Sequence, residues 1–220
     1  MTDCSHLWPS PGVDPLNHWG TLAGKLQRES LTRPLIIALR GLTLGENESH
    51  DVVSRPGYHD TGVLLVPGPL TSGPFVFRLS TVPYQTHSRA SDDGDGDGDG
   101  DVATIRPGWY VLTRARTGSD PIWTMATIDG RARIPCSRDL NNNGRIDGNE
   151  AERDFTASAI LLHKGADGGR SSIGCATAPL ESLQVIAKAG PVIDYRLVLA
   201  SEAARLMAPA GDSDHPEAIA

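Results

Sequence analysis

Short apolar runs bounded by glycine and proline recur along most of this chain. They occupy residues 35–39, 62–66, 75–79, 109–113 and 122–127, and turn residues such as Asp129-Gly130 separate them. Runs of this length, rich in branched and aromatic side chains, are typical of β-strands. We therefore expect a mainly β fold (β-rich α+β), with one or two short helices.

Helical spacing occurs in two places. Residues 14–30 repeat apolar side chains at helical intervals, and we expect a short amphipathic helix there, within an N-terminal segment 1–33. The helix either packs against the main domain or docks a carrier. Further on, apolar residues at helical intervals begin after Pro179 and end before Gly190, which predicts a second helix. The main domain should span residues 34–200, end in a strand at 192–199, and be followed by a disordered tail, 201–220.

Residues 92–101 form a run of alternating aspartate and glycine with no apolar side chain to bury. Such a run predicts a solvated loop inserted between strands. A calcium role for this loop is an alternative, but no glutamate follows to close the coordination shell.

Composition narrows the function further. The net charge of −7 disfavours a nucleic-acid partner, because binding to phosphates requires an excess of positive charge. No apolar run is long enough for a membrane span, and the first residues carry no secretory signal. The three cysteines lack zinc-site spacing. Cys136 either pairs with Cys4 or is simply buried.

A twelve-residue segment, 139–150, matches the EF-hand calcium loop at every required position. Side-chain oxygens alternate, a glycine (Gly144) permits the sharp turn, and a glutamate closes the shell. Pro135 lies too close for an entering helix, so we expect a solitary structural Ca²⁺ site. Its ligands would be Asp139, Asn141, Asn143, the carbonyl of Arg145, Asp147 and Glu150.

The second chemical signal is His163, at the end of an apolar run 157–163, followed by a glycine-rich loop and by Ser172, Gly174 and Cys175. A thiol is a good nucleophile only as the thiolate, and an imidazole nearby can take its proton and later return it to a leaving amine. A glycine beside the cysteine lets backbone N–H groups approach a developing oxyanion. No Gly-x-Ser-x-Gly elbow surrounds Ser171 or Ser172, which disfavours a serine hydrolase.

This order of strand, histidine, loop and Ser-x-Gly-Cys resembles the L,D-transpeptidase catalytic domain (the YkuD-like family). The resemblance is strongest over residues 155–200, and the segment 106–110 is similar to the family's Pro-Gly-aromatic strand. It implies a β-sandwich or barrel, Cys175 as nucleophile, His163 as base and then acid, and a peptidoglycan stem peptide as substrate.

The motif departs from the family at Ile173, Ala176 and Thr177, and the arginine that usually follows the cysteine is missing. Recognition of a substrate carboxylate is therefore an open question. Lys164, Arg170 and Arg138 are candidates for supplying the positive charge.

These features predict a cysteine-dependent L,D-transpeptidase or L,D-carboxypeptidase that works through a thioester acyl-enzyme. A chain made in the cytoplasm without a signal would reach the periplasm or cell wall by an unknown route, with a secretion or phage carrier as a possible partner. The alternatives are a non-enzymatic calcium-binding structural or secreted module with an inert Cys175, and a cysteine amidase or endopeptidase on another bond of the same polymer.

Overall fold

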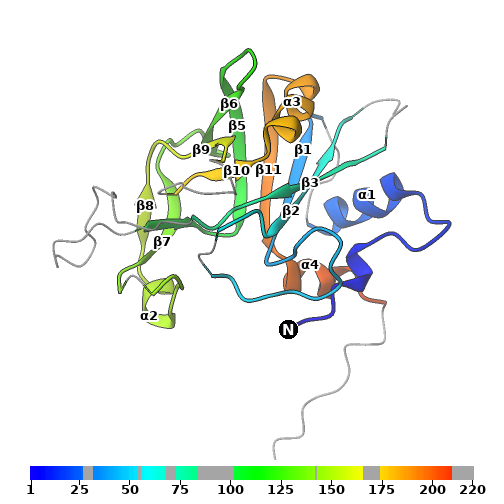
Figure 1. Ribbon diagram of the computed structural model, residues 1–220, viewed down its shortest axis with the longest axis horizontal. Coiled ribbons are helices and arrows are strands. Elements are labelled where there is room, and N and C mark those ends of the chain that lie inside the picture. Colours follow the sequence, from blue (N-terminus) through cyan, green and yellow to red (C-terminus); the bar gives the residue numbers. More distant parts are fainter. Residues whose placement is uncertain are drawn as a thin grey trace, which may run out of the picture.

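The computed structural model describes residues 1–26, 32–53, 56–67, 73–83, 102–141, 143–165 and 174–209. Within these ranges the chain is mainly β, with two sheets and a few short helices (Figure 1). The mainly β fold class expected from the sequence is confirmed.

The larger sheet has eight strands in the order β10-β9-β6-β5-β11-β1-β2-β3. A bridge between Ser80 and Thr177 joins its two edge strands through a pair of backbone hydrogen bonds of 2.8 and 2.9 Å. The sheet is thus closed into a near-barrel, which removes its open edges at this point. Its strands are β1 (Leu35–Arg40), β2 (Asp60–Leu65), β3 (Phe75–Leu79), β5 (Gly108–Arg116), β6 (Ile122–Thr127), β9 (Leu161–Lys164), β10 (Ala176–Ala178) and β11 (Val192–Leu199).

A second, three-stranded sheet lies beside the barrel and carries the calcium-loop sequence at its lower end in Figure 1. It consists of β4 (Val102–Ile105), β7 (Ile134–Asp139) and β8 (Phe155–Ala157), all antiparallel. Helix α2 (Gly148–Ala151) connects β7 to β8. Pro135 is accommodated inside β7, and its carbonyl accepts a hydrogen bond from the Arg106 backbone. As predicted, no helix enters the calcium loop; a strand does.

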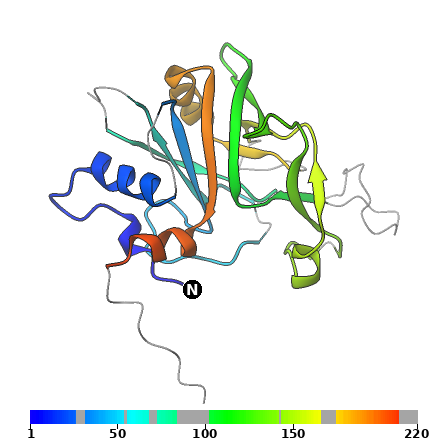
Figure 2. The same ribbon diagram turned by 180° about the vertical axis from the view of Figure 1, so that it is seen from behind.

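Helices cover the barrel at distinct places (Figures 1 and 2). Helix α3 (Leu180–Ala189) contributes Leu183 and Ile186 to the cluster inside the barrel. The 3-10 helix η1 (Ser5–Leu7), α1 (Pro15–Lys25) and α4 (Ala200–Met207) pack on the outer face of β1 and β2. Trp19 of α1 is fully buried there, so the predicted amphipathic helix packs against the main domain.

Two apolar clusters lie on opposite faces of β1. Ile36 and Ala38 point into the barrel, whereas Leu35, Ile37 and Leu39 meet the helices outside. Because strand side chains alternate, such a strand must be apolar on both faces, which explains its unbroken hydrophobic run. Cys136 belongs to the inner cluster and Cys4 to the outer one, and neither forms a disulfide, so the pairing alternative for these two residues is wrong.

Two buried charges, Arg40 and Asp60, lie at the end of β1 and are connected through Thr81. Arg40 donates to Oγ1 of Thr81 at 2.7 Å and to the carbonyls of Ile105 and Thr81. The carboxylate of Asp60 accepts from the Gly41 backbone at 2.8 Å and from both the backbone and hydroxyl of Thr81 at 2.7 Å. Burial lowers the pKa of Arg40, and the charge of Asp60 opposes that shift.

The structure corrects two details of the sequence analysis. The run 157–163 is not one strand: it divides into the end of β8 and the start of β9, with Ala159 between them in a left-handed conformation at φ 56°. The tail assigned to 201–220 is wrong over 201–207, which form most of α4. That helix buries Ala203 and Ala204 against the barrel, a tertiary contact that local composition does not reveal.

Three predicted segments lie partly or wholly outside the described residues: the acidic run 92–101, the central part of the glycine-rich loop and the end of the tail. Among the described residues, no helix combines the length and the apolar character that crossing a bilayer requires.

Candidate functional site

His163 lies in β9 and is held in one orientation by the backbone. Its Nδ1 is 2.7 Å from the carbonyl oxygen of Lys164. A carbonyl can only accept a hydrogen bond, so Nδ1 carries a hydrogen, and in the neutral ring Nε2 then holds the lone pair. The half-buried ring is therefore in the tautomer that a general base needs, with a third group orienting it.

Cys175 immediately precedes β10 and is also half-buried. Its Sγ makes a long contact of 4.0 Å with the carbonyl oxygen of Ala159, the residue with positive φ. Burial raises the pKa of the thiol, and a hydrogen bond from the Leu161 backbone opposes this. The neutral thiol is thus favoured while the site holds no substrate.

The parallel pairing of β9 with β10 determines how these two residues relate. Thr177 pairs with His163 and Ala176 with Leu162, so Cys175 is level with Leu161. Leu162 and Ala176 belong to the inner cluster, and alternation then turns His163 and Cys175 to the outer face. Strand spacing of about 4.8 Å and a rise of about 3.3 Å per residue put such diagonal positions about 8 Å apart at the backbone. Two side chains that point to one face can span that distance when a substrate brings them together.

Gly174 is constrained by its neighbours. A Cβ at this position would be 2.9 Å from Cδ1 of Ile160 and 3.4 Å from Ala103 of β4. The glycine therefore lets the chain before Cys175 pass between the barrel and the second sheet. Ser172 and Ile173, which complete the motif, lie outside the described residues.

The candidates for carboxylate recognition have different positions. Arg138 is buried, with its guanidinium 5.8 Å from the centre of the Phe155 ring, and so belongs to the second sheet. Lys164 is exposed at the end of β9. Arg170 lies outside the described residues.

The predicted calcium loop is folded around its acidic side chains. Asp139 accepts from the backbone of Asn143 at 3.0 Å and of Gly144 at 2.7 Å, and Glu150 accepts from the backbone of Leu140 at 2.8 Å. Gly144 has φ 81°, which is the turn that the loop pattern requires of it. Glu150 also accepts from the Asp147 backbone at 2.7 Å, and Asp147 accepts from the side-chain amides of Asn141 and Asn143, both at 3.0 Å.

This donor set fits Ca²⁺. The side-chain amides of Asn141 and Asn143 meet the Asp147 carboxylate, and Asp139 and Glu150 are buried at 8% and 2% exposure. Burial raises the pKa of Asp139, and the charges of Glu150 and Asp147 raise it further against the hydrogen bonds from Gly144 and Asn143. Buried carboxylates that repel one another are what a hard cation relieves, and rotating the two amides would turn their oxygens inward. The side chain of Arg145 points elsewhere, toward Asp51 at 3.8 Å, which leaves its carbonyl as the group that would bind the ion.

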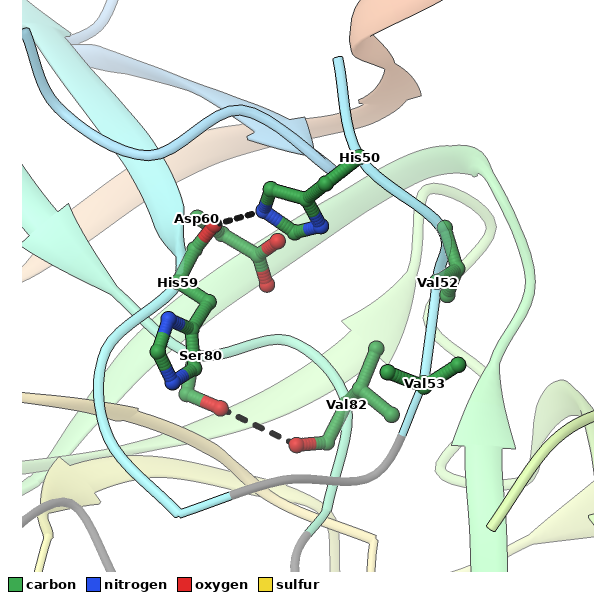
Figure 3. Close-up of a pocket in the computed structure, with 7 residues that line it drawn as sticks. All are labelled: His50, Val52, Val53, His59, Asp60, Ser80 and Val82. Carbon is green, nitrogen blue, oxygen red and sulfur yellow. Dashed lines mark hydrogen bonds between the residues drawn. The ribbon is translucent and has the colours of Figure 1, made fainter. Parts of the chain in front are cut away.

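The sequence analysis missed one pocket (Figure 3). Its walls come from the segment between β1 and β2, from the start of β2 and from the end of β3. Its polar groups are two histidines, an aspartate and a serine, which occur in no recognisable spacing; only their position at strand ends could have drawn attention. The lining residues are His50, Val52, Val53, His59, Asp60, Ser80 and Val82.

Comparison with known proteins adds no relative: no protein-family model, no curated protein and no solved structure matches this chain.

Proposed function

We propose that this protein is a cysteine-dependent acyl-transfer enzyme of the L,D-transpeptidase type, acting on peptidoglycan stem peptides. Either an amine or water would resolve its thioester, which gives an L,D-transpeptidase or an L,D-carboxypeptidase. The observation that supports this most directly is the orientation of His163 by the Lys164 carbonyl, on the same outer face as Cys175.

In the proposed reaction, Nε2 of His163 takes the proton of the Cys175 thiol as sulfur attacks the carbonyl carbon of a stem-peptide bond. A C–S bond forms and, on collapse of the tetrahedral intermediate, the C–N bond breaks. His163 gives its proton to the departing amine, D-alanine. An amine or water then attacks the thioester, loses a proton to His163, and releases Cys175.

We also propose that the loop 139–150 binds Ca²⁺ as a structural ion. Asp139, Asn141, Asn143, the Arg145 carbonyl, Asp147 and Glu150 would hold it, and the ion would neutralise the gathered carboxylates. Peptidoglycan lies outside the cytoplasm, where calcium is plentiful enough for a site of modest affinity.

The decisive experiment compares wild type with Cys175→Ala on purified muropeptides, with and without calcium, and reads the products by mass spectrometry. Loss of D-alanine or new cross-links from wild type alone would support the proposal and identify the reaction. Cleavage at an amide bond elsewhere in the polymer would instead indicate an amidase or endopeptidase that uses the same two residues.

A second candidate function is a non-enzymatic calcium-binding module. The raised pKa of the Cys175 thiol favours it, because a thiol that stays neutral is a weak nucleophile. Under this alternative, wild type and Cys175→Ala leave the muropeptides equally unchanged, while calcium still stabilises both proteins.

A further inference from the structure

A tyrosine from a distant part of the chain packs on the end of β9, close to His163. A Cβ added to Gly165 would lie 2.5 Å from the Tyr58 hydroxyl oxygen and 3.1 Å from Cζ of its ring. At such distances either the tyrosine or the backbone would have to shift, so glycine is the residue that admits Tyr58 here. Tyr58 lies just before β2, and β3 and β10 separate β2 from β9 in the closed sheet. The contact therefore joins two segments that are far apart in the chain.

Gly165 and His163 face the same side of the sheet. The N–H of Gly165 donates to the Ala178 carbonyl at 3.4 Å, which continues the parallel ladder of β9 and β10 by one residue. Because strand residues alternate between faces, the side of Gly165 that Tyr58 covers is the outer face, on which the His163 ring lies. The two positions are about 6.6 Å apart along the backbone. Gly165 is buried and Tyr58 is half-buried, so the tyrosine covers the outer face next to His163.

The covered glycine is directly connected to the group that orients His163. Nδ1 of His163 lies 2.7 Å from the carbonyl oxygen of Lys164. That carbonyl and the N–H of Gly165 belong to one peptide group, which is planar and moves as a unit. A shift or rotation at Gly165 therefore moves the acceptor on which the tautomer of His163 depends. The ladder bond to Ala178 restrains this peptide group within the sheet, and Tyr58 restrains it from the outer face.

We propose that Tyr58 is a positioning residue for His163. Packed on Gly165, it holds the peptide group between Lys164 and Gly165 in the orientation that keeps the hydrogen on Nδ1 and leaves the Nε2 lone pair for Cys175. The use of His163 as a base rests on the proposed function, whereas the packing of Tyr58 on Gly165 does not. No sequence motif contains Tyr58, because only the folded sheet brings it to β9.

The first test reads the tautomer of His163 in the full-length protein without substrate. Ring nitrogen NMR shifts at about pH 9, where an ordinary imidazole is neutral, distinguish Nδ1–H from Nε2–H, and His163→Gln assigns the signals by their absence. Wild type and Tyr58→Phe, which keeps the ring, should show Nδ1–H, whereas Tyr58→Ala should show a mixture of the two tautomers.

The same variants have an expected effect on catalysis. On muropeptides, Tyr58→Ala should lower kcat by about tenfold to a hundredfold, the larger value being what a misplacement of about 1 Å at reacting groups costs. The KM should change little, because Tyr58 acts through His163 and not on the substrate. Tyr58→Phe should retain most of the activity.

The second test changes the glycine, and it remains informative if Tyr58→Ala fails to fold. Gly165→Ala should disturb the packing, because the new methyl meets the Tyr58 hydroxyl at 2.5 Å, and should give the same tautomer mixture and loss of kcat. Adding Tyr58→Phe removes that oxygen and leaves ring carbon at 3.1 Å, so the double variant should recover kcat by at least about threefold. Gly73→Ala is the control, because Gly73 lies just before β3 with open space at its Cβ position.

An Nδ1–H tautomer that persists in both Tyr58→Ala and Gly165→Ala would overturn the inference. Equal losses of kcat in Tyr58→Phe and Tyr58→Ala would overturn it too, because the hydroxyl would then act through a hydrogen bond and not through packing. Failure of the proposed function gives a different result, in which wild type leaves the muropeptides unchanged while the His163 tautomer still responds to the changes at Tyr58 and Gly165.

Discussion

At the scale of single residues, the candidate nucleophile and base are prepared to different degrees. His163 already has the tautomer of a base, because the Lys164 carbonyl fixes it. Cys175 does not yet have the character of a thiolate, because burial favours its neutral form. In the proposed reaction, substrate binding would therefore have to bring the sulfur and the imidazole together.

The pH dependence of Cys175 alkylation follows from this. The thiol pKa in the folded protein lies above its ordinary value of 9.0, so the thiolate fraction is small at pH 7 and rises about tenfold per pH unit. The same shift stabilises the fold below the unfolded pKa, and that contribution is lost as pH rises through the folded one. Iodoacetamide labelling of Cys175 from pH 6 to pH 10, quantified by peptide mass spectrometry, measures how the thiolate fraction changes with pH. Cys4 and Cys136, both fully buried, should stay unlabelled, and a plateau reached below pH 9.0 would contradict the prediction.

Replacing the candidate base tests its role directly. His163→Gln should lower kcat/KM on muropeptides by about 10²- to 10⁴-fold, the usual contribution of general acid–base catalysis. Stability should change little, since the ring is half-buried and its hydrogen bond is to the adjacent residue, Lys164. Lys164→Ala is the matched control, because it removes an exposed side chain and keeps the carbonyl that orients His163. Equal losses in both variants would argue against His163 as the base.

At the scale of secondary-structure elements, local patterns predicted some parts of the site and not others. The helix after Pro179 and the turn at Gly144 could be predicted from patterns of about a dozen residues, whereas the strand predicted over 157–163 is divided at Ala159. The bridge between Ser80 and Thr177 joins positions far apart in the chain, and no local periodicity encodes it. The pocket depends on that bridge, so sequence reasoning named Cys175 and His163 but not His59.

Strand β7 is another element that depends on contacts between positions far apart in the chain. Pro135 predicted only that no helix enters the calcium loop; that a strand lies there instead depends on the separate small sheet in which Pro135 pairs with Thr156. The run 157–163 is the opposite case: its apolar pattern is continuous in the sequence, but the structure divides it into two strands at Ala159. The break turns the chain from the second sheet to the barrel and brings the Ala159 carbonyl to Cys175.

A pair of glycine substitutions tests the packing of the strands. A Cβ on Gly62 would lie under 3.0 Å from three atoms of the Phe77 ring across β2 and β3, so Gly62→Ala should destabilise the protein by about 1–3 kcal/mol. Gly20, inside α1, has open space at its Cβ position, and Gly20→Ala should stabilise by about 0.5–1 kcal/mol. Urea unfolding gives both values. Two changes of the same sign would contradict the assigned packing.

At the scale of the whole molecule, the calcium loop and the catalytic candidates are connected through the backbone. The loop follows β7, closes through Glu150 of α2, and continues into β8, which pairs back onto β7. From β8 the chain passes Ala159 and enters β9, the strand of His163. The guanidinium of Arg106 also holds the segment between α2 and β8 in place, because it donates hydrogen bonds to the carbonyls of Ala151 and Arg153.

Calcium should therefore act on stability and on catalysis together. An ion held at a hundred to a thousand times its Kd should stabilise the fold by about 3–4 kcal/mol, because it binds the folded loop alone. Thermal unfolding with calcium and with chelator measures this gain. Glu150→Gln removes the carboxylate that closes the calcium site and should abolish the stabilisation by calcium. Glu152→Gln changes a neighbouring exposed carboxylate and should leave that stabilisation unchanged.

The catalytic part of this coupling is separable from stability. Well below the unfolding midpoint of the metal-free protein, chelation should still lower kcat, since β8 and Ala159 lose a fixed anchor next to Cys175 and His163. A misplacement of about 1 Å at reacting groups is enough to cost about a hundredfold in rate. If chelation leaves kcat unchanged at a temperature where the protein stays folded, the ion stabilises the second sheet without positioning the catalytic residues.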